Sequence, residues 1–474
     1  MIDRIRAQRG PNVALVEPGR GLTLTYAELI DRVDDAAGAI SERAGRGGLV
    51  FLAMGSELDA VVLYLACLSA RLPVCLVEPR SEPLARLASA YAPNLILLPP
   101  GMRGPSGYQG GAEVIPGSEY RPWRIERDLL RPLHADLAVL LTTSGSTGSP
   151  KLVRLSARNL ESNAAAIGEY LKLSPDERAI QSLPAHYSYG LSIINSHLLA
   201  GASIVLVPDS FIRREFWKAV DEHGCTSFAG VPYMYETLHR LRFEPGRHPS
   251  LRSMTQAGGA LHPDLISAFR ERSVAAGVRF FVMYGQTEAT ARISYVPWDR
   301  LGDKIGSIGI AIPGGRLSLA PVDGMEGSEE LVYEGPNVMM GYADTAQDLD
   351  LGDVQRGVLR TGDLGTVDPD GFYSVVGRLK RFAKLFGRRV SLEDIEREME
   401  SSFPVRTAAL DGGDRILLHV ESVGNIPVAT LTSHAARFLG VPPRWVDVRL
   451  SPSLPRTSAG KKDYQALEAL GRSG

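Results

Sequence analysis

The sequence predicts an α/β protein with a large N-terminal domain of βα units, a β-rich subdomain that closes it, and a small C-terminal α+β domain. From Leu49 to Phe281, short runs of Val, Ile and Leu alternate with longer amphipathic segments. This alternation is typical of helices packed around largely parallel sheets. From Gly306 to Val376, brief apolar runs are separated by Gly, Pro and Asp turns, which predicts the β-rich region.

Within the N-terminal domain, the clearest predicted strands are Leu95–Leu98, Leu137–Leu141, Ser203–Val207 and Arg279–Met283. The apolar stretch from Val61 to Val77 is interrupted by Arg71 and Pro73. It therefore predicts a helix followed by a buried strand, with no transmembrane segment. The stretch from Pro99 to Gly117 is rich in Gly and Pro and predicts a surface loop.

A change of composition marks the start of the small domain. The basic stretch RLKRFAKLFGRR follows Gly377, and Ser391 precedes a predicted helix that runs to Glu400 with acidic residues in its first turn. A serine N-cap and early acidic residues both stabilise a helix N-terminus. We therefore expect a domain boundary near Lys380, with one domain over residues 1–379 and the second over residues 380–474.

Charge and cysteine usage exclude several classes of function. The chain has 52 Lys and Arg against 54 Asp and Glu, a formal net charge of -2, so no global basic field points to nucleic acid. The three cysteines, Cys67, Cys75 and Cys225, are scattered and lack CxxC spacing, which predicts reduced thiols and no structural zinc. The N-terminus, MIDRIRAQRG, has no apolar run and predicts no secretory signal, so we expect a cytoplasmic protein.

A loop rich in Ser, Thr and Gly follows the predicted strand LAVLLTT. Glycines let backbone N–H groups approach phosphate oxygens, hydroxyls add donors and a lysine supplies counter-charge, so the loop suits a triphosphate. It is not a Walker loop, because Ser149 and Pro150 separate the last glycine from the lysine. A flexible surface turn is the alternative. The candidate phosphate-binding residues are Thr143, Ser144, Gly145, Ser146, Thr147, Gly148 and Lys151.

The decapeptide TTSGSTGSPK, residues 142–151, resembles the phosphate loop of the adenylate-forming superfamily of acyl-CoA synthetases, carrier-protein adenylation domains and luciferases. Other motifs of that superfamily occur in its order and cover nearly the whole chain. One tetrapeptide is weak evidence, but an ordered set is strong. The set comprises TYAEL at Thr25–Leu29, YGQTE at Tyr284–Glu288, RTGD at Arg360–Asp363, GRLK at Gly377–Lys380 and SLPRTSAGK at Ser453–Lys461.

The resemblance implies that these motifs bind ATP and Mg²⁺. Glu288 is implied as the Mg²⁺ ligand and, with Thr287, as a catalytic residue. Asp363 is implied to accept hydrogen bonds from the ribose hydroxyls, and Arg378 to reach ribose or phosphate oxygens. Taken without the resemblance, Glu288 could be a solvated carboxylate at a helix start, Asp363 a turn residue and Arg378 a surface residue. Gly258 and Gly259 could be ordinary turn glycines. The remaining cofactor-binding residues are Gly258, Gly259, Ala260, Tyr284, Gly285 and Gln286, together with Thr287.

The resemblance also implies that Lys461 is the catalytic lysine of adenylation. An ammonium group can bind the acyl carboxylate and the α-phosphate region together and stabilise charge as it moves to pyrophosphate. Lys462 is adjacent, but the Gly-Lys register favours Lys461. Because Lys461 and the phosphate loop lie in different predicted domains, catalysis requires closure, for which Lys380 is the implied hinge.

In relatives, the acyl pocket is lined by the segments that match residues 184–190, 230–233 and 256–259. No Asp occurs in the first segment, where amino-acid-selecting relatives hold the substrate ammonium, so an α-amino acid is disfavoured and a β-amino or hydroxy acid stays open. Of its aromatic residues, either His186 or Tyr187 could gate the pocket, and simple packing is as good an explanation. The candidate pocket residues are His186, Tyr187, Gly190, Val231 and Tyr233.

These features together predict activation of a small-molecule carboxylic acid by ATP to acyl-AMP with release of pyrophosphate, and the resemblance implies transfer to a thiol. The resemblance implies coenzyme A or the phosphopantetheine of an acyl carrier protein, and the compact segment after Lys380 leaves the carrier as a separate protein. Arg388 and Arg389 beside Gly387 fit either acceptor or a solvated basic loop.

Transfer to an amine and a catalytically silent nucleotide-binding relative are the alternatives. A P-loop NTPase is disfavoured because no GxxxxGK[ST] follows a strand. The acid's chain length and the oligomeric state stay open.

Overall fold

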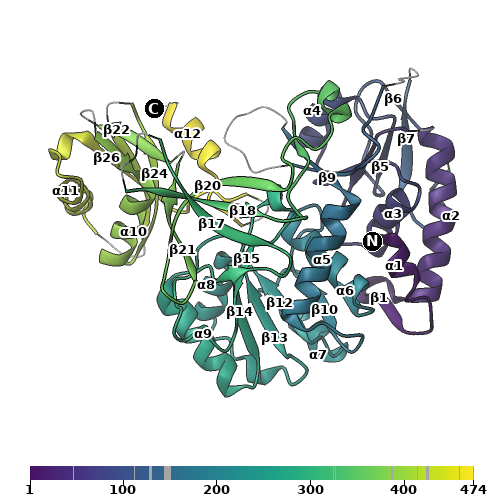
Figure 1. Ribbon diagram of the computed structural model, residues 1–474, viewed down its shortest axis with the longest axis horizontal. Coiled ribbons are helices and arrows are strands. Elements are labelled where there is room, and N and C mark those ends of the chain that lie inside the picture. The colour runs from purple at the N-terminus through teal and green to yellow at the C-terminus, as the bar shows by residue number, and fades with distance from the viewer. Residues whose placement is uncertain are drawn as a thin grey trace. The chain divides into compact units, whose positions relative to one another are not determined.

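The computed structural model describes residues 1–45, 47–111, 113–126, 131–142, 151–323, 325, 327–379, 381–385, 388–413, 415–422, 426–457 and 460–472. The chain forms two compact units, each with its own hydrophobic core (Figure 1). The first unit comprises Met1–Leu317 and Tyr333–Leu359, and the second comprises Ser318–Val332 and Arg360–Gly474.

One sheet of the first unit is mainly parallel. Its strands follow the order β16-β15-β14-β13-β12-β10-β11-β1-β2. Neighbours from β14 to β1 are parallel, while β2, β15 and β16 are antiparallel additions at the edges. The strands are β1 (Val13–Glu17), β2 (Leu22–Thr25), β10 (Arg178–Gln181), β11 (Ser203–Leu206), β12 (Ser227–Gly230), β13 (Ser253–Gln256), β14 (Arg279–Tyr284), β15 (Ser294–Val296) and β16 (Ile310–Ala311).

A second sheet of this unit has the order β19-β9-β8-β4-β3-β5-β7-β6, with β8, β4, β3 and β5 parallel. The flanking strands are antiparallel. Its strands are β3 (Val50–Ala53), β4 (Val74–Val77), β5 (Leu95–Leu98), β6 (Tyr108–Gly110), β7 (Arg121–Ile125), β8 (Leu137–Thr142), β9 (Leu152–Ser156) and β19 (Gly341–Ala343).

Helices fill the space between the two sheets and cover their outer faces (Figure 1). Val62 of α3 and Ile194 of α6 share one core with Leu76 of β4 and Ile204 of β11. On the other face of the first sheet, α7, α8 and α9 pack aromatic side chains against β12 and β14. The helices are α1 (Ile2–Arg6), α2 (Tyr26–Ala44), α3 (Leu58–Ser69), α4 (Ser81–Tyr91), α5 (Ala157–Leu171), α6 (Ser188–Leu199), α7 (Arg214–Glu222), α8 (Pro232–Arg240) and α9 (Pro263–Ala275), with 3-10 turns η1 (Pro18–Arg20), η2 (Pro245–Arg247), η3 (Thr287–Ala289) and η4 (Ala346–Asp350).

The β-rich region forms the sheet β17-β18-β20-β21, most of which belongs to the second unit. Beyond it, helices α10 and α11 cover the sheet β24-β25-β26, and a hairpin joins β22 to β23. The elements are β17 (Arg316–Pro321), β18 (Glu329–Glu334), β20 (Val358–Val367), β21 (Tyr373–Arg378), β22 (Phe382–Leu385), β23 (Arg388–Ser391), α10 (Leu392–Ser402), β24 (Val405–Asp411), β25 (Ile416–Ser422), α11 (Val428–Leu439), η5 (Pro443–Trp445), β26 (Val446–Ser451) and α12 (Tyr464–Arg472).

The predicted α/β class is confirmed, and the four strands predicted for the N-terminal domain correspond to β5, β8, β11 and β14. Ser391 caps α10 and accepts a hydrogen bond from Asp394 N. The predicted loop from Pro99 to Gly117 is wrong in part, because it contains β6, which pairs with β7. A Cβ on Gly110 would lie 3.2 Å from the Trp123 ring, so this glycine lets the strand pack closely.

None of the helices that the structure describes combines the length and the apolar character needed to cross a bilayer.

Candidate active site

Four predicted site segments follow the carboxyl ends of parallel strands in the first sheet. Strands β10, β12, β13 and β14 lead into residues 184–190, 231–233, 257–260 and 285–288. The strand register places Gly230, Gln256 and Val282 side by side, so three of these ends are level. Ligands of open α/β sheets bind outside the carboxyl ends of the strands. The segments thus meet where such a ligand is expected.

The turn after β14 requires glycine. A Cβ on Gly285 would lie only 1.8 Å from the carbonyl oxygen of Ala291, so the chain can fold back here only without a side chain. The turn leads into η3, which carries Thr287 and Glu288. The hydroxyls of Thr287 and Ser188 lie 3.1 Å apart, which joins η3 to the N-terminus of α6.

Glu288 is held by a tyrosine that lies outside the predicted site. Tyr342 of β19 donates a 2.7 Å hydrogen bond to Glu288 Oε1, and the Lys151 ammonium lies 3.5 Å from the centre of the Tyr342 ring. Burial, with the adjacent Glu288 carboxylate, raises the pKa of Tyr342, so the phenol stays protonated as a donor. The structure therefore brings the predicted phosphate-binding lysine and the predicted metal ligand to one aromatic ring.

The Glu288 carboxylate suits a Mg²⁺ ion whose other ligands include phosphate oxygens. Its Oε1 accepts from Tyr342, while no described residue forms a hydrogen bond with its Oε2. Mg²⁺ commonly keeps several waters and uses one or two carboxylates plus substrate phosphates. In the described part of the chain, no group of three or more His, Cys, Asp or Glu side chains could hold an ion by itself. A metal here would depend on oxygens of the nucleotide.

Gly258 lies in a loop where three segments come close together. Its φ of +87° favours glycine, and a Cβ would lie 3.0 Å from Tyr187 Oη and 3.1 Å from Val231 Cγ1. Gly259 and Ala260, which follow, are exposed. The loop therefore presents backbone, with little side-chain bulk, beside two of the predicted pocket residues, and a flat ring can approach such a surface.

His186 and Tyr187 point to different partners. Nδ1 of His186 lies 3.0 Å from the carbonyl oxygen of Met54, just after β3. Burial lowers the pKa of His186, so the neutral ring donates to that carbonyl. Of the two aromatic residues, Tyr187 is the one placed at Gly258, while His186 ties its segment to the second sheet.

The remaining predicted pocket residues have packing contacts. Tyr233 packs edge to face against Phe211, with ring centroids 6.2 Å apart. A Cβ on Gly190 would lie 2.1 Å from Pro184 O, so this position is sterically limited to glycine. These contacts leave the proposed pocket roles as predictions.

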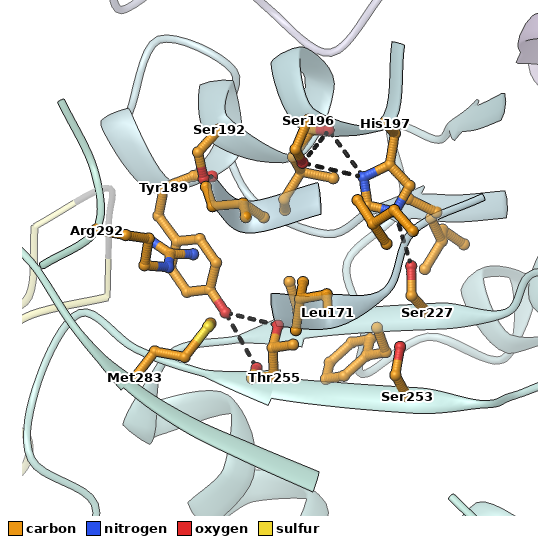
Figure 2. A pocket seen from close by; sticks show the side chains of 17 residues that line it. Leu171, Tyr189, Ser192, Ser196, His197, Ser227, Ser253, Thr255, Met283 and Arg292 are labelled. Atoms are coloured by element: carbon orange, nitrogen blue, oxygen red, sulfur yellow. Dashed lines mark hydrogen bonds between the residues drawn. The ribbon is translucent and has the colours of Figure 1, made fainter. Parts of the chain in front are cut away.

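A cavity lies between the first sheet and helices α5 and α6 (Figure 2). Residues of β10, β12, β13, β14 and α6 line it, and its walls include Tyr189, Ser192, Thr255, Met283 and Arg292. The five predicted pocket residues are not in its lining, although several are sequence neighbours of residues that are. The space open to the centre of a water molecule is about 20 Å³. That is room for one or two waters, or for one small polar group.

In the second unit, Asp363 and Arg378 lie opposite each other on paired strands β20 and β21. Arg378 Nε lies 3.0 Å from Asp363 Oδ1. The Asp363 side chain is 3% exposed and that of Arg378 is 55% exposed, so a solvent-facing guanidinium covers a buried carboxylate. The two residues predicted to bind the ribose are therefore brought together.

Glu330 of β18 holds the RTGD segment in place. Its buried carboxylate accepts from Arg360 Nε at 2.7 Å and from Gly362 N at 2.9 Å. The Thr361 hydroxyl donates to Leu331 O at 2.7 Å. These bonds fix the backbone directly before Asp363.

Lys462, next to the predicted catalytic Lys461, is held by two carboxylates. Lys462 Nζ lies 2.9 Å from Glu396 Oε2 and 3.0 Å from Glu400 Oε1. Burial alone would lower the pKa of Lys462, but these two carboxylates outweigh burial and raise it. Lys461 follows Gly460, whose φ is +75°, in a tight turn. These ion pairs hold the Lys462 ammonium against Glu396 and Glu400 within the second unit. Because Lys462 is already engaged there, Lys461 is supported as the catalytic candidate.

Several predicted residues lie outside the described residues. They are the phosphate-loop residues Thr143, Ser144, Gly145, Ser146, Thr147 and Gly148, the hinge Lys380, and Gly387. Their roles, like the other residue roles and the boundary at Lys380, stay predictions.

Sequence reasoning missed Tyr342, Glu330 and Arg292. Tyr342 stands in a short strand with no catalytic motif of its own, and only the pairing of β19 with β9 brings it to Glu288. The signal for Glu330 was an acidic pair, Glu329–Glu330, at the start of an otherwise apolar strand. Arg292 was detectable as a lone cation between apolar residues after the YGQTE motif.

Comparison with protein families matches residues 108–343 to the AMP-binding enzyme family. Feruloyl-CoA synthase of an Amycolatopsis species is 30% identical over 442 residues, covering 86% of this chain and 84% of the relative. Isonitrile lipopeptide synthase of Streptomyces coeruleorubidus is 30% identical over 98% of this chain, which spans 33% of that protein. Sulfoacetate–CoA ligase of Cupriavidus necator is 31% identical over 70% of this chain, and 66% of its own length is matched.

Solved structures share the fold. The o-succinylbenzoate CoA synthetase of Bacillus subtilis, in complex with its acyl-adenylate intermediate, aligns with a TM-score of 0.77 at 20% identity over 98% of this chain and 96% of that one. ATP-bound MatB of Rhodopseudomonas palustris aligns with a TM-score of 0.79 at 23% identity over 99% and 98%. With the family match and the 30% identity to feruloyl-CoA synthase, the chain belongs to the AMP-binding enzymes of the adenylate-forming superfamily, and it is similar to their CoA ligases.

Proposed function

We propose that this protein activates a carboxylic acid with ATP to an acyl-AMP and pyrophosphate, and then transfers the acyl group to a thiol. The grouping of Lys151, Tyr342 and Glu288 beside the turn after β14 carries the proposal. A fixed cation and a carboxylate suited to Mg²⁺ at one place match the charge of a triphosphate. CoA ligases among the relatives support the same reaction class.

In the first step, a carboxylate oxygen of the acid attacks the α-phosphorus of ATP, and the bond from that phosphorus to the pyrophosphate oxygen breaks. Both reactants are anions, so neutralising charge and fixing their positions provide most of the catalysis. In the proposed site, Lys151 neutralises phosphate charge and Lys461 bridges the acid and the α-phosphate region. Bound Mg²⁺ supplies further charge neutralisation, and Glu288 would hold it.

Nucleotide recognition is proposed for both units. The backbone at Gly258–Ala260 would receive the adenine ring, together with Tyr284–Thr287, and Asp363 would accept from the ribose hydroxyls. Because Arg378 already bonds one Asp363 oxygen, ribose must use the other oxygen or displace the guanidinium. Residues 143–148 would contact the phosphates. A hinge at Lys380, separating domains 1–379 and 380–474, would let Lys461 approach.

In the second step, the thiol sulfur attacks the acyl carbonyl carbon, the bond from that carbon to AMP breaks, and the thiol proton passes to solvent. Coenzyme A is the proposed acceptor because several relatives bear the name of CoA ligases. The phosphopantetheine of a separate acyl carrier protein is the second candidate, since it offers the same thiol chemistry. A cytoplasmic location, suited to the three free buried cysteines, completes the proposal.

Acid-dependent release of pyrophosphate tests the proposal. Purified protein is incubated with Mg²⁺-ATP, hydroxylamine and a panel of carboxylic acids, and pyrophosphate, AMP and ADP are measured for the wild type and Lys461→Ala. We expect AMP and pyrophosphate in equal amounts with at least one acid, and a loss of about 10²–10³-fold in the variant. A folded, ATP-binding wild type that releases no pyrophosphate with any acid, or releases ADP instead, refutes it. Coenzyme A and a phosphopantetheinylated carrier are then compared as acceptors.

A further inference from the structure

Arg292 is a buried cation that forms no ion pair within the described part of the chain. It is 3% exposed, and among the described residues no carboxylate forms an ion pair with it. Its Nε is buried and has no hydrogen-bond partner. Burying a charge is costly unless it is paired and hydrogen-bonded, so such a group signals either strain or an absent ligand.

The surrounding structure holds Arg292 in place. The amide groups of Asn163 and Asn337 both donate to its carbonyl oxygen, at 3.2 and 2.8 Å. Its guanidinium lies 3.9 Å from the centre of the Tyr189 ring. Figure 2 shows the two side chains next to each other. Tyr189 is itself fixed, because its hydroxyl donates to Thr255 O at 3.1 Å. Arg292 is therefore presented to the cavity on a rigid base.

The cavity that Arg292 lines is mainly apolar, and no acidic side chain stands in its lining among the described residues. Its lining includes hydroxyls such as Ser192 and Thr255 but no Asp or Glu. Burial lowers the pKa of His197 to about 4, so His197 is neutral at pH 7 and Arg292 is the charged group among the described lining residues. The positive charge in this cavity is unbalanced.

Part of the cavity lining lies near the carboxyl ends of the strands in the first sheet. Met283 directly precedes Tyr284 at the end of β14, and Thr255 stands two residues before Ala257 at the end of β13. Arg292 follows Glu288 by one short turn, and Tyr189 lies within the segment that carries Tyr187. These lining residues are therefore close in sequence to the predicted site segments.

We propose that Arg292 binds a second anionic group of the acid substrate in this cavity, so that the protein selects short acids bearing a carboxylate or sulfonate beyond the one that is activated. This inference rests on the proposed function. The small room, about 20 Å³ for the centre of a water molecule, suits one such group and not an extended acyl chain. A bidentate guanidinium contact matches carboxylate or sulfonate geometry and favours it over a neutral isostere.

Matched pairs of acids test the inference. The linear dicarboxylic acids from oxalate to glutarate are each compared with their monoamides, which keep the shape but lose the second charge, and sulfoacetate is compared with propionate. The readout is the ratio of kcat/KM within each pair, measured by pyrophosphate release. We expect the wild type to prefer at least one dianion by about 10- to 100-fold, Arg292→Gln to lose that preference, and Arg292→Lys to keep part of it.

A control variant separates selectivity from stability. Arg178 of β10, whose guanidinium bonds Ser203 Oγ and His223 O, lies in the same sheet, and Arg178→Gln should leave the ratio unchanged even if it lowers overall activity. Equal activity on dianions and monoamides, with no change of ratio in Arg292→Gln, overturns the inference while adenylation stands. If no acid is activated, the proposed function fails. Calorimetric binding of the same pairs to the wild type and Arg292→Gln, with and without AMP, then decides the role of Arg292.

Discussion

Tyr342 donates a 2.7 Å hydrogen bond to the Glu288 carboxylate while its ring faces the ammonium of Lys151 at 3.5 Å. The three residues come from separate stretches of chain, and pairing of β19 with β9 brings Tyr342 beside the strand that Lys151 precedes. One ring thus contacts both the proposed phosphate-binding cation and the proposed metal-binding carboxylate. Catalysis of phosphoryl chemistry depends on such positioning.

Replacing Tyr342 with Phe should loosen Glu288 without creating a cavity. We expect kcat/KM for Mg²⁺-ATP to fall about 10-fold and the Mg²⁺ concentration for half-maximal activity to rise, because the carboxylate loses a charged hydrogen bond. Titration of Mg²⁺ in the pyrophosphate assay measures both quantities. Tyr108→Phe removes a hydroxyl that bonds Pro93 O in the same unit and serves as the control. A Mg²⁺ requirement identical in the two variants would contradict the positioning role.

We expect the Lys461→Ala variant to lose adenylation activity and the Lys462→Ala variant to lose stability. Loss of Lys461 is expected to reduce adenylation by about 10²–10³-fold. Loss of Lys462 leaves Glu396 and Glu400 without that partner and should lower the free energy of unfolding by roughly 1–3 kcal/mol. Pyrophosphate release and thermal unfolding of the full chain distinguish them. The reverse pattern would assign catalysis to Lys462.

Two glycine-to-alanine changes in one unit should have opposite effects. A Cβ at Gly285 would lie 1.8 Å from a backbone oxygen, so Gly285→Ala should cost at least about 3 kcal/mol of stability or abolish folding. At Gly168, within α5, a Cβ would meet nothing within 4 Å. Gly168→Ala should therefore stabilise the protein by about 0.5–1 kcal/mol. Urea unfolding midpoints test both, and a tolerated Gly285→Ala would mean that the turn can be rebuilt.

His197 should make stability fall in mild acid. Burial lowers its pKa from 6.5 to about 4 in the folded protein. Between these values the unfolded chain binds a proton that the folded protein does not, so the free energy of unfolding declines as pH falls from 6.5 to 4, by at most about 3 kcal/mol. Above pH 6.5 this group contributes no pH dependence.

Unfolding midpoints at pH 7 and pH 5 for the wild type and His197→Gln isolate the contribution of this group. The glutamine amide can replace the donor that His197 Nδ1 presents to Ile193 O at 2.9 Å. The stability difference between the two proteins should shrink at pH 5. A constant difference would show that His197 titrates normally.

Sequence alone predicted the α/β class, four buried strands, and the helix that Ser391 caps. These features are local, since apolar runs, caps and turn residues act within a few positions. The ordered motifs identified the superfamily for the same reason, because phosphate-binding and turn chemistry need particular residues at short spacing. The strand within Pro99–Gly117 was missed because its glycines serve packing against Trp123, a tertiary contact.

Only the tertiary structure determined which side chains share a partner. It placed Tyr187 at Gly258 and His186 at Met54, paired Lys462 with two glutamates, and brought Tyr342 to Glu288. It also showed that Arg292 is buried without a carboxylate partner among the described residues. Motif spacing fixes the kind of chemistry, but contacts between segments far apart in the chain depend on strand order and packing, and no local pattern encodes them.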